Sequence, residues 1–220
     1  MTPKSAAVEK VMRLAPVIPV LVIEDIEHAL PIAEALVAGG LPALEVTLRT
    51  ECAIEAIKVM KQVPGATVGA GTVLTPEDLA KSIDAGAEFI VSPGLTPTLG
   101  EAAAKSGIPF LPGTANASDV MLALELGFDR LKFFPAMAAG GPSALKAISA
   151  PLAAAKFCPT GGVTPDNAPD WLALDAVLCV GGSWMVPKHV LSAAEGGSPD
   201  VAKIEATART AAQLGPKETA

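Results

Sequence analysis

A lysine inside an apolar segment is the residue that most strongly suggests chemistry in this sequence. Lys132 follows Leu131 and precedes two phenylalanines and a proline, in the segment LKFFP (131–135). Lysine is rarely fully buried. One interpretation is that its stem packs among apolar side chains while its ammonium group reaches the rim. The other is that an apolar pocket disfavours the ammonium form, so that the neutral amine can attack a ketone and form a Schiff base.

A second charge, Glu45, lies inside the apolar segment ALEVTL (43–48). Taken alone, it fits a structural ion pair with Lys132 or Arg49 as well as it fits catalysis. Schiff-base formation and cleavage of an adjacent carbon–carbon bond both require protons to move, and one carboxyl group near the amine can carry them. Two buried charges would also be costly in a mere binding module. The pair therefore favours catalysis, with the planar guanidinium of Arg49 available for a carboxylate.

Paired glycines follow two late apolar segments. Gly161 and Gly162 follow one of them, and Gly181, Gly182 and Ser183 follow the next. Glycine often serves only to turn the chain. It also lets the backbone approach an anion closely, and many α/β barrels bind phosphate in the loops after strands 7 and 8. The two glycine pairs therefore predict a phosphate site with a serine hydroxyl beside it.

Short apolar segments alternate with longer helical patterns along the whole chain. Their centres lie roughly 20 to 26 residues apart, which fits a strand, a loop, a helix of about three turns and a second loop. We therefore expect an α/β protein, a single (β/α)8 TIM barrel over residues 1–220. A doubly wound open sheet is the alternative, but no glycine fingerprint follows the first strand. The expected strands lie within 16–23, 43–48, 67–73, 88–93, 109–112, 130–135, 156–162 and 176–182.

Helix signals fill the intervals between these segments. Thr75 precedes a proline and acidic residues, which is typical of a helix start. Ser118 and Asp119 are the candidate caps of another helix. The segment 5–15 predicts an extra helix before the first strand, placed to cover the bottom of the barrel. Helices are expected over 26–40, 75–89 and 117–128.

Composition excludes several classes of protein. The chain has 16 Lys and Arg against 23 Asp and Glu, a net charge of −7, and this balance argues against a nucleic-acid surface. Hydrophobic residues make up 50% of the chain, which excludes intrinsic disorder. The two histidines, His28 and His189, lack the spacing of metal ligands, so we expect no metal site.

The cysteines and the N-terminal region indicate the compartment. Cys52, Cys158 and Cys179 have no CxxC spacing and read as free thiols of a reducing environment. The apolar run 14–23 is far shorter than the ~20 residues that span a bilayer. The first residues lack the pattern of a secretory signal. We therefore expect a cytoplasmic protein that does not enter a membrane.

At these residues the sequence resembles the bacterial 2-keto-3-deoxy-6-phosphogluconate (KDPG) aldolase family, whose members often also accept 4-hydroxy-2-oxoglutarate (KHG). The resemblance implies a homotrimeric class I aldolase of barrel fold that needs no metal or organic cofactor and acts in the Entner–Doudoroff pathway. The loop PGTANASD (112–119) departs from the expected PGxxTxSE. The matching segments are ALVAGG (35–40), LEVTLRTECA (44–53), VGAGTVL (68–74), SPGLT (92–96), LKFFPA (131–136), FCPTGG (157–162) and VLCVGGSW (177–184).

The resemblance assigns a role to each matching position. Lys132 would be the Schiff-base lysine and Glu45 the general acid and base. The substrate would be a small phosphorylated keto acid, KDPG, cleaved to pyruvate and glyceraldehyde 3-phosphate. The pyruvyl part would contact Arg49, Thr72 and Phe134, and the hydroxyl and phosphate end would contact Thr160, Gly161, Gly162, Gly181, Gly182 and Ser183.

Other activities remain open at this point. The same chemistry fits KHG or the phosphogalactonate analogue of KDPG as substrate. A pyruvate aldolase that uses a divalent metal ion is a different class, although a cluster of ligands for the ion is missing from the sequence. A sugar-phosphate epimerase or isomerase on the same barrel is another, and it would not need a lysine in a strand.

Overall fold

The computed structural model describes residues 3–187 and 199–215. Its strands are β1 (Val17–Leu21), β2 (Ala43–Thr47), β3 (Thr67–Gly71), β4 (Phe89–Val91), β5 (Phe110–Leu111), β6 (Gly113–Thr114), β7 (Arg130–Phe133), β8 (Lys156–Pro159) and β9 (Val180–Gly182). Its helices are α1 (Pro3–Met12), the 3-10 turn η1 (Ile26–His28), α2 (Ala29–Ala38), α3 (Ala53–Met60), α4 (Pro76–Asp84), α5 (Pro97–Ser106), α6 (Ala117–Glu125), α7 (Gly141–Ser149), α8 (Ala168–Leu172) and α10 (Val201–Ala211).

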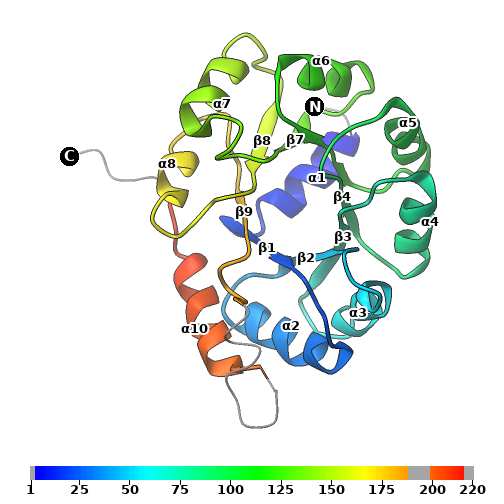
Figure 1. Cartoon of the computed structure of the whole chain (residues 1–220), viewed down its shortest axis with the longest axis vertical. Helices are drawn as coiled ribbons and strands as arrows, with labels where there is room; N and C mark the ends of the chain where they lie inside the picture. The colour runs from blue at the N-terminus through cyan, green and yellow to red at the C-terminus, as the bar shows by residue number, and fades with distance from the viewer. Residues whose placement is uncertain (1–2, 188–198, 216–220) are drawn as a thin grey trace.

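The strands form a parallel barrel with helices around its outside (Figure 1). One sheet has the order β5-β4-β3-β2-β1-β9, and a second has the order β6-β7-β8. Isolated parallel bridges, Phe157 to Val177 and Thr160 to Gly181, join the two sheets on one side. The predicted α/β TIM barrel is therefore confirmed.

The fifth strand of the barrel differs from its prediction. It was expected as one segment over 109–112, but Pro112 divides it into β5, which pairs with β4, and β6, which pairs with β7. Proline has no N–H to donate to a ladder. Its carbonyl still accepts a hydrogen bond from the N–H of Lys132 at 2.8 Å. The chain thus changes partner at the proline while the barrel stays closed.

Helix α6 starts differently from the prediction. Asn116, in an extended conformation, accepts a hydrogen bond from the N–H of Asp119 and is the N-cap. Ser118 and Asp119 lie inside the first turn, so the prediction that they cap the helix was wrong. The Asp119 carboxylate instead accepts from the N–H of Ala115 at 2.8 Å. Thr75 caps α4 as expected, in a capping box with Asp78.

Apolar side chains form two layers. The larger lies between the strands and the surrounding helices. The smaller fills the barrel's lower interior and includes Val8, Val11 and Met12 of α1 together with Ile18 and Leu111 from the strands. The extra N-terminal helix therefore closes the bottom of the barrel, as predicted. Among the described residues, none of the helices is long and apolar enough to cross a membrane.

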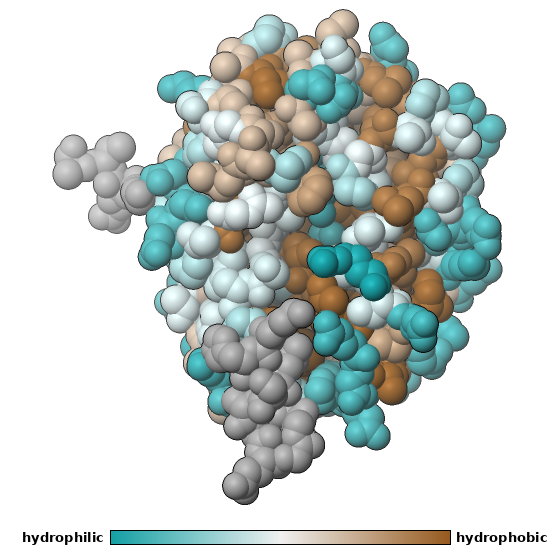
Figure 2. Space-filling model, viewed as in Figure 1, coloured by the Kyte–Doolittle hydropathy of each residue, from teal (hydrophilic) through white to brown (hydrophobic). Residues whose placement is uncertain are grey.

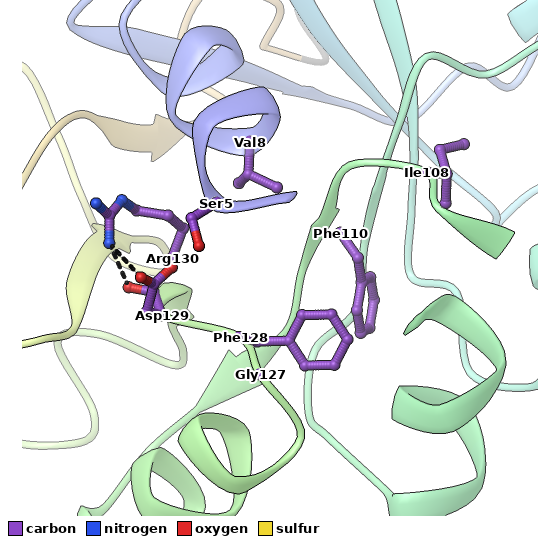
Figure 3. A pocket seen from close by; sticks show the side chains of 8 residues that line it. All are labelled: Ser5, Val8, Ile108, Phe110, Gly127, Phe128, Asp129 and Arg130. Atoms are coloured by element: carbon purple, nitrogen blue, oxygen red, sulfur yellow. Dashed lines mark hydrogen bonds and ion pairs between the residues drawn. The ribbon is translucent and has the colours of Figure 1, made fainter. Parts of the chain in front are cut away.

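Charged side chains fix α1 at the start of β7, where Figure 3 shows Arg130 paired with Asp129 close to Ser5 and Val8 of α1. The Glu9 carboxylate pairs with Arg13 at 2.6 Å and with Arg130 at 2.7 Å, and Arg130 also pairs with Asp129 at 3.2 Å. The adjacent cavity, lined by Ser5 and Phe128 among others, measures about 10 Å³, which is room for about one water molecule. This cavity is therefore too small for a substrate, and the charged pairs beside it hold α1 in place.

Hydrogen bonds from Arg13 and then from Arg130 lower the pKa of Glu9 below its ordinary value of 4.5. A lowered pKa in the folded state stabilises the protein above the unfolded-state value, and this contribution is lost as the pH falls through the folded-state value. We predict that Glu9→Gln lowers the free energy of unfolding by about 1 kcal/mol at pH 7. The difference from the parent should begin to shrink as the pH falls below 4.5 and should disappear below the lowered folded-state pKa, as measured by urea denaturation across pH.

The control is Glu55→Gln, which removes a carboxylate from an exposed pair with Lys58 and should change stability little at any pH. A Glu9→Gln effect of the same size at pH 7 and at pH 3 would contradict the assignment.

Candidate active site

Two charged side chains from opposite parts of the chain meet inside the barrel. Lys132 Nζ, on β7, donates a hydrogen bond to Glu45 Oε1, on β2, at 3.1 Å. The two side chains are only 6% and 4% exposed. Leu131 and Phe133 pack into the outer apolar layer, so strand alternation turns Lys132 inward. The structure thus brings together the two residues on which the predicted chemistry depends.

The strand next to β7 holds the backbone of Lys132. Its N–H donates to Pro112 O at 2.8 Å, and its carbonyl accepts a hydrogen bond from Thr114 Oγ1 at 3.1 Å. The ring centroid of Phe134 lies 5.4 Å from Nζ, a cation–π distance. The backbone of Lys132 and its Nζ atom are therefore both held in place.

A cavity of about 240 Å³ lies at the carboxyl ends of β1, β8 and β9. Phe134 belongs to its wall and also lies against Lys132, which links the cavity to the buried pair. Lys132 and Glu45 are not themselves in the wall. Arg49, exposed, is the basic residue of this lining. The wall also includes Thr160, Gly161, Gly162, Gly181, Gly182 and Ser183, together with Val20, Val22 and Val163.

Glycine is required at four positions of this wall, for two different physical reasons. Gly161 and Gly162 have φ of 100° and 76°, a left-handed conformation that favours glycine. At Gly181 a Cβ would lie 2.2 Å from Thr160 Oγ1, so that glycine makes room for the buried threonine. Gly182 makes room in the same way for the ring of Trp184.

Thr72 is placed differently from the other expected contacts. It follows β3 directly and is not part of the cavity wall. Its φ of 58° is the one positive value at a non-glycine residue in the part of the chain that the structure describes. Strained backbone of this kind concentrates at functional sites. A second cavity, of about 390 Å³, also has Phe134 in its wall and is lined mainly by residues that follow β3, β4 and β6.

Sequence reasoning missed the apolar part of the wall. Val20 and Val22 alternate along and just beyond β1, and Val163 follows the first glycine pair. Valine carries no chemical signal, although the position of Val22 at the end of a strand would have placed it at the barrel mouth. Within residues 3–187 and 199–215, no group of three or more His, Cys, Asp or Glu side chains could hold a metal. His189 lies outside these ranges.

Comparisons with known proteins agree on one family. The family model for KDPG and KHG aldolases matches residues 8–207. The chain is 60% identical over 204 residues to the 2-dehydro-3-deoxy-phosphogluconate aldolase of Zymomonas mobilis, covering 93% of this chain and 94% of the relative. It is 53% identical over 188 residues to the KHG/KDPG aldolase of Escherichia coli, covering 85% and 88%.

Solved structures match equally well. The Zymomonas mobilis aldolase, crystallised with 3-phosphoglycerate, has a TM-score of 0.91 and 57% identity, covering 98% of this chain and all of that one. The KDPG aldolase of Legionella pneumophila has a TM-score of 0.89 and 44% identity, covering 94% and 98%. In that crystal, pyruvate is captured at low pH as a covalent carbinolamine intermediate.

Removing one partner of the buried pair leaves the other charge unpaired. We predict that Lys132→Met lowers the free energy of unfolding by about 3 kcal/mol, and that Lys132→Met combined with Glu45→Leu recovers most of the loss. Urea denaturation at pH 7 measures both. Equal stability of the single and double variants would contradict the prediction.

Lys156→Met is the matched control on the neighbouring strand. Lys156 Nζ donates to Asp175 O at the exposed start of β8. Its removal should cost less than about 1 kcal/mol.

Proposed function

Because this chain belongs to the KDPG and KHG aldolase family, we propose that it cleaves 2-keto-3-deoxy-6-phosphogluconate to pyruvate and glyceraldehyde 3-phosphate. It is a carbon–carbon lyase of the Schiff-base class. The observation that carries the proposal is the buried contact of 3.1 Å between Lys132 Nζ and Glu45 Oε1. The covalent carbinolamine in the Legionella pneumophila relative supports the same class of chemistry.

The first half of the reaction forms the imine. The amine of Lys132 adds to the C2 ketone of the substrate and gives a carbinolamine. Glu45 delivers a proton to the carbinolamine oxygen, which leaves as water, and a protonated imine remains. The enclosed position of the pair keeps bulk water away from these transfers, and proton relay by a positioned carboxyl group accelerates such steps by about 10²- to 10⁴-fold.

The second half breaks the bond. Glu45, now a carboxylate, takes the proton of the C4 hydroxyl, directly or through a water. The electrons of the C3–C4 bond move into the imine, so that glyceraldehyde 3-phosphate leaves and an enamine remains on Lys132. Protonation at C3 and hydrolysis by water release pyruvate and restore the amine. The reaction involves no net oxidation or reduction, so these steps need no redox partner.

The cavity wall, together with Thr72 after β3, supports an assignment of the substrate ends. We assign the pyruvyl part to Arg49, Thr72 and Phe134, since a guanidinium pairs well with a carboxylate. Backbone N–H groups of glycine loops can donate hydrogen bonds to an anion at close range. The hydroxyl and phosphate end is therefore assigned to Thr160, Gly161, Gly162, Gly181, Gly182 and Ser183.

A homotrimer is the assembly that we infer from the family resemblance. Leu74 and Met121 are 55% and 53% exposed, which is high for large apolar side chains. Figure 2 shows hydrophobic residues running from the upper right of this face, near α6 and α5, to the lower right, near α3. Contact with neighbouring subunits would cover such a surface.

The free cysteines Cys52, Cys158 and Cys179 support a cytoplasmic location.

Trapping the imine tests the mechanism. Incubation with pyruvate and borohydride should reduce the imine and add the mass of one reduced pyruvyl group to the peptide that contains Lys132. Peptide mass spectrometry locates the adduct. Lys132→Arg should take up no adduct and lose activity. An adduct on Lys156 instead, or activity retained by Lys132→Arg, would overturn the proposal.

Introducing a charge tests the phosphate end. Ser183→Asp places a carboxylate where the phosphate is expected, and like charges brought together cost binding energy. We predict that kcat/KM falls at least about tenfold more for KDPG than for KHG, which lacks the phosphate. Steady-state kinetics with both substrates measures the ratio. Ser183→Asn, neutral and of similar size, is the control and should change the ratio little. A ratio that Ser183→Asp leaves unchanged places the phosphate elsewhere.

A further inference from the structure

Strand β3 presents glycines where its neighbours present side chains. Gly69 and Gly71 pair in register with Glu45 and Thr47 of β2. The space that their side chains would fill is occupied from adjoining strands. A Cβ on Gly69 would lie 2.5 Å from the ring of Phe89, on β4. The two glycines therefore leave gaps in the wall that neighbours fill.

The three atoms nearest to a Cβ built on Gly71 all belong to one side chain, that of Glu45. A Cβ there would lie 2.3 Å from Oε1, 2.6 Å from Cγ and 2.8 Å from Cδ of Glu45. Real Cβ atoms essentially never come this close. The φ angle of Gly71 lies outside the left-handed region, so its backbone conformation accepts alanine. The requirement for glycine is thus spatial, and it comes from Glu45.

The atom that lies closest to this gap is the one that contacts the amine. Glu45 Oε1 accepts the hydrogen bond from Lys132 Nζ at 3.1 Å. An alanine at 71 would have to displace Oε1 by about 1 Å to restore an ordinary contact. A displacement of this size at a reacting group can cost about 10²-fold in rate.

We propose that Gly71 is a positioning residue: its missing side chain lets the Glu45 carboxyl lie against β3 within hydrogen-bond reach of Lys132. The inference rests on the proposed function, in which Glu45 moves the protons. It adds a requirement at a residue that does not itself touch the reacting atoms. Two neighbours then fix the position of the Glu45 carboxyl group: Lys132 Nζ, which donates a hydrogen bond to it, and Gly71 of β3, which leaves space for it.

The test begins with Gly71→Ala. We expect kcat for KDPG cleavage to fall about 100-fold. KM should change by less than about threefold, because Gly71 is not among the residues that we assign to the substrate ends. Gly69→Ala is the matched control on the same face of the same strand. Its Cβ meets Phe89, so it should lower the melting temperature and leave kcat within about threefold of the parent. An equal loss of kcat in both variants would show that any added methyl group in β3 is harmful, and would overturn the proposal.

A double-mutant cycle with Glu45→Ala separates positioning from packing. Glu45→Ala removes the side chain that the new methyl group would strike. Adding Gly71→Ala to it should therefore cause no further fall in kcat and no fall in melting temperature. The same comparison decides the matter if Gly71→Ala alone fails to fold, because the double variant should then fold. A double variant that is less stable or less active than Glu45→Ala overturns the proposal.

The outcomes also distinguish this inference from the proposed function. Full activity in Glu45→Ala would remove Glu45 from the mechanism. A large loss in Glu45→Ala together with full activity in Gly71→Ala would leave the mechanism standing and remove only the role of Gly71.

Discussion

The contact between Lys132 and Glu45 is the interaction to which the rest of the barrel is adapted. Taking two charges out of water costs several kcal/mol per ion, and their mutual attraction offsets this only with good geometry. Apolar residues of similar volume would often be at least as stable. Stabilisation of the fold is therefore a poor explanation for this buried pair. Its retention at 6% and 4% exposure is understandable if a dry amine and a nearby carboxyl group are needed for chemistry.

The barrel separates the groups that close it from the groups to which we assign substrate binding. At the amino ends of the strands, α1 packs its apolar side chains into the interior, and Glu9 and Arg130 fasten it. At the carboxyl ends, glycine loops, Arg49 and Phe134 surround an open cavity. Arg130 and Lys132 lie two residues apart on β7. Arg130 holds α1 in place, and Lys132 lies in the buried pair with Glu45. One short strand thus carries both a structural cation and the lysine for which we propose a catalytic role.

How much the sequence could predict depended on whether a signal was local. The apolar residues on either side of Lys132 and Glu45 correctly singled out both charges, because a charge inside an apolar strand is a signal that is local to that strand. The division of a strand at Pro112 depends on which strand each half pairs with. The cap at Asn116 was missed because three polar residues compete there and only the backbone conformation decides. Val20 and Val22 were missed because their role is shape rather than chemistry.

Bare strands explain how a barrel can hold polar side chains in its interior at defined places. Glu45 of β2 lies over Gly71 of β3, and Thr160, after β8, lies over Gly181 of β9. In each case the polar group occupies space that a neighbouring strand leaves empty, so its position follows from a residue with no side chain. The information is divided between two strands. A glycine on the strand beside a buried polar residue therefore indicates where that polar side chain lies.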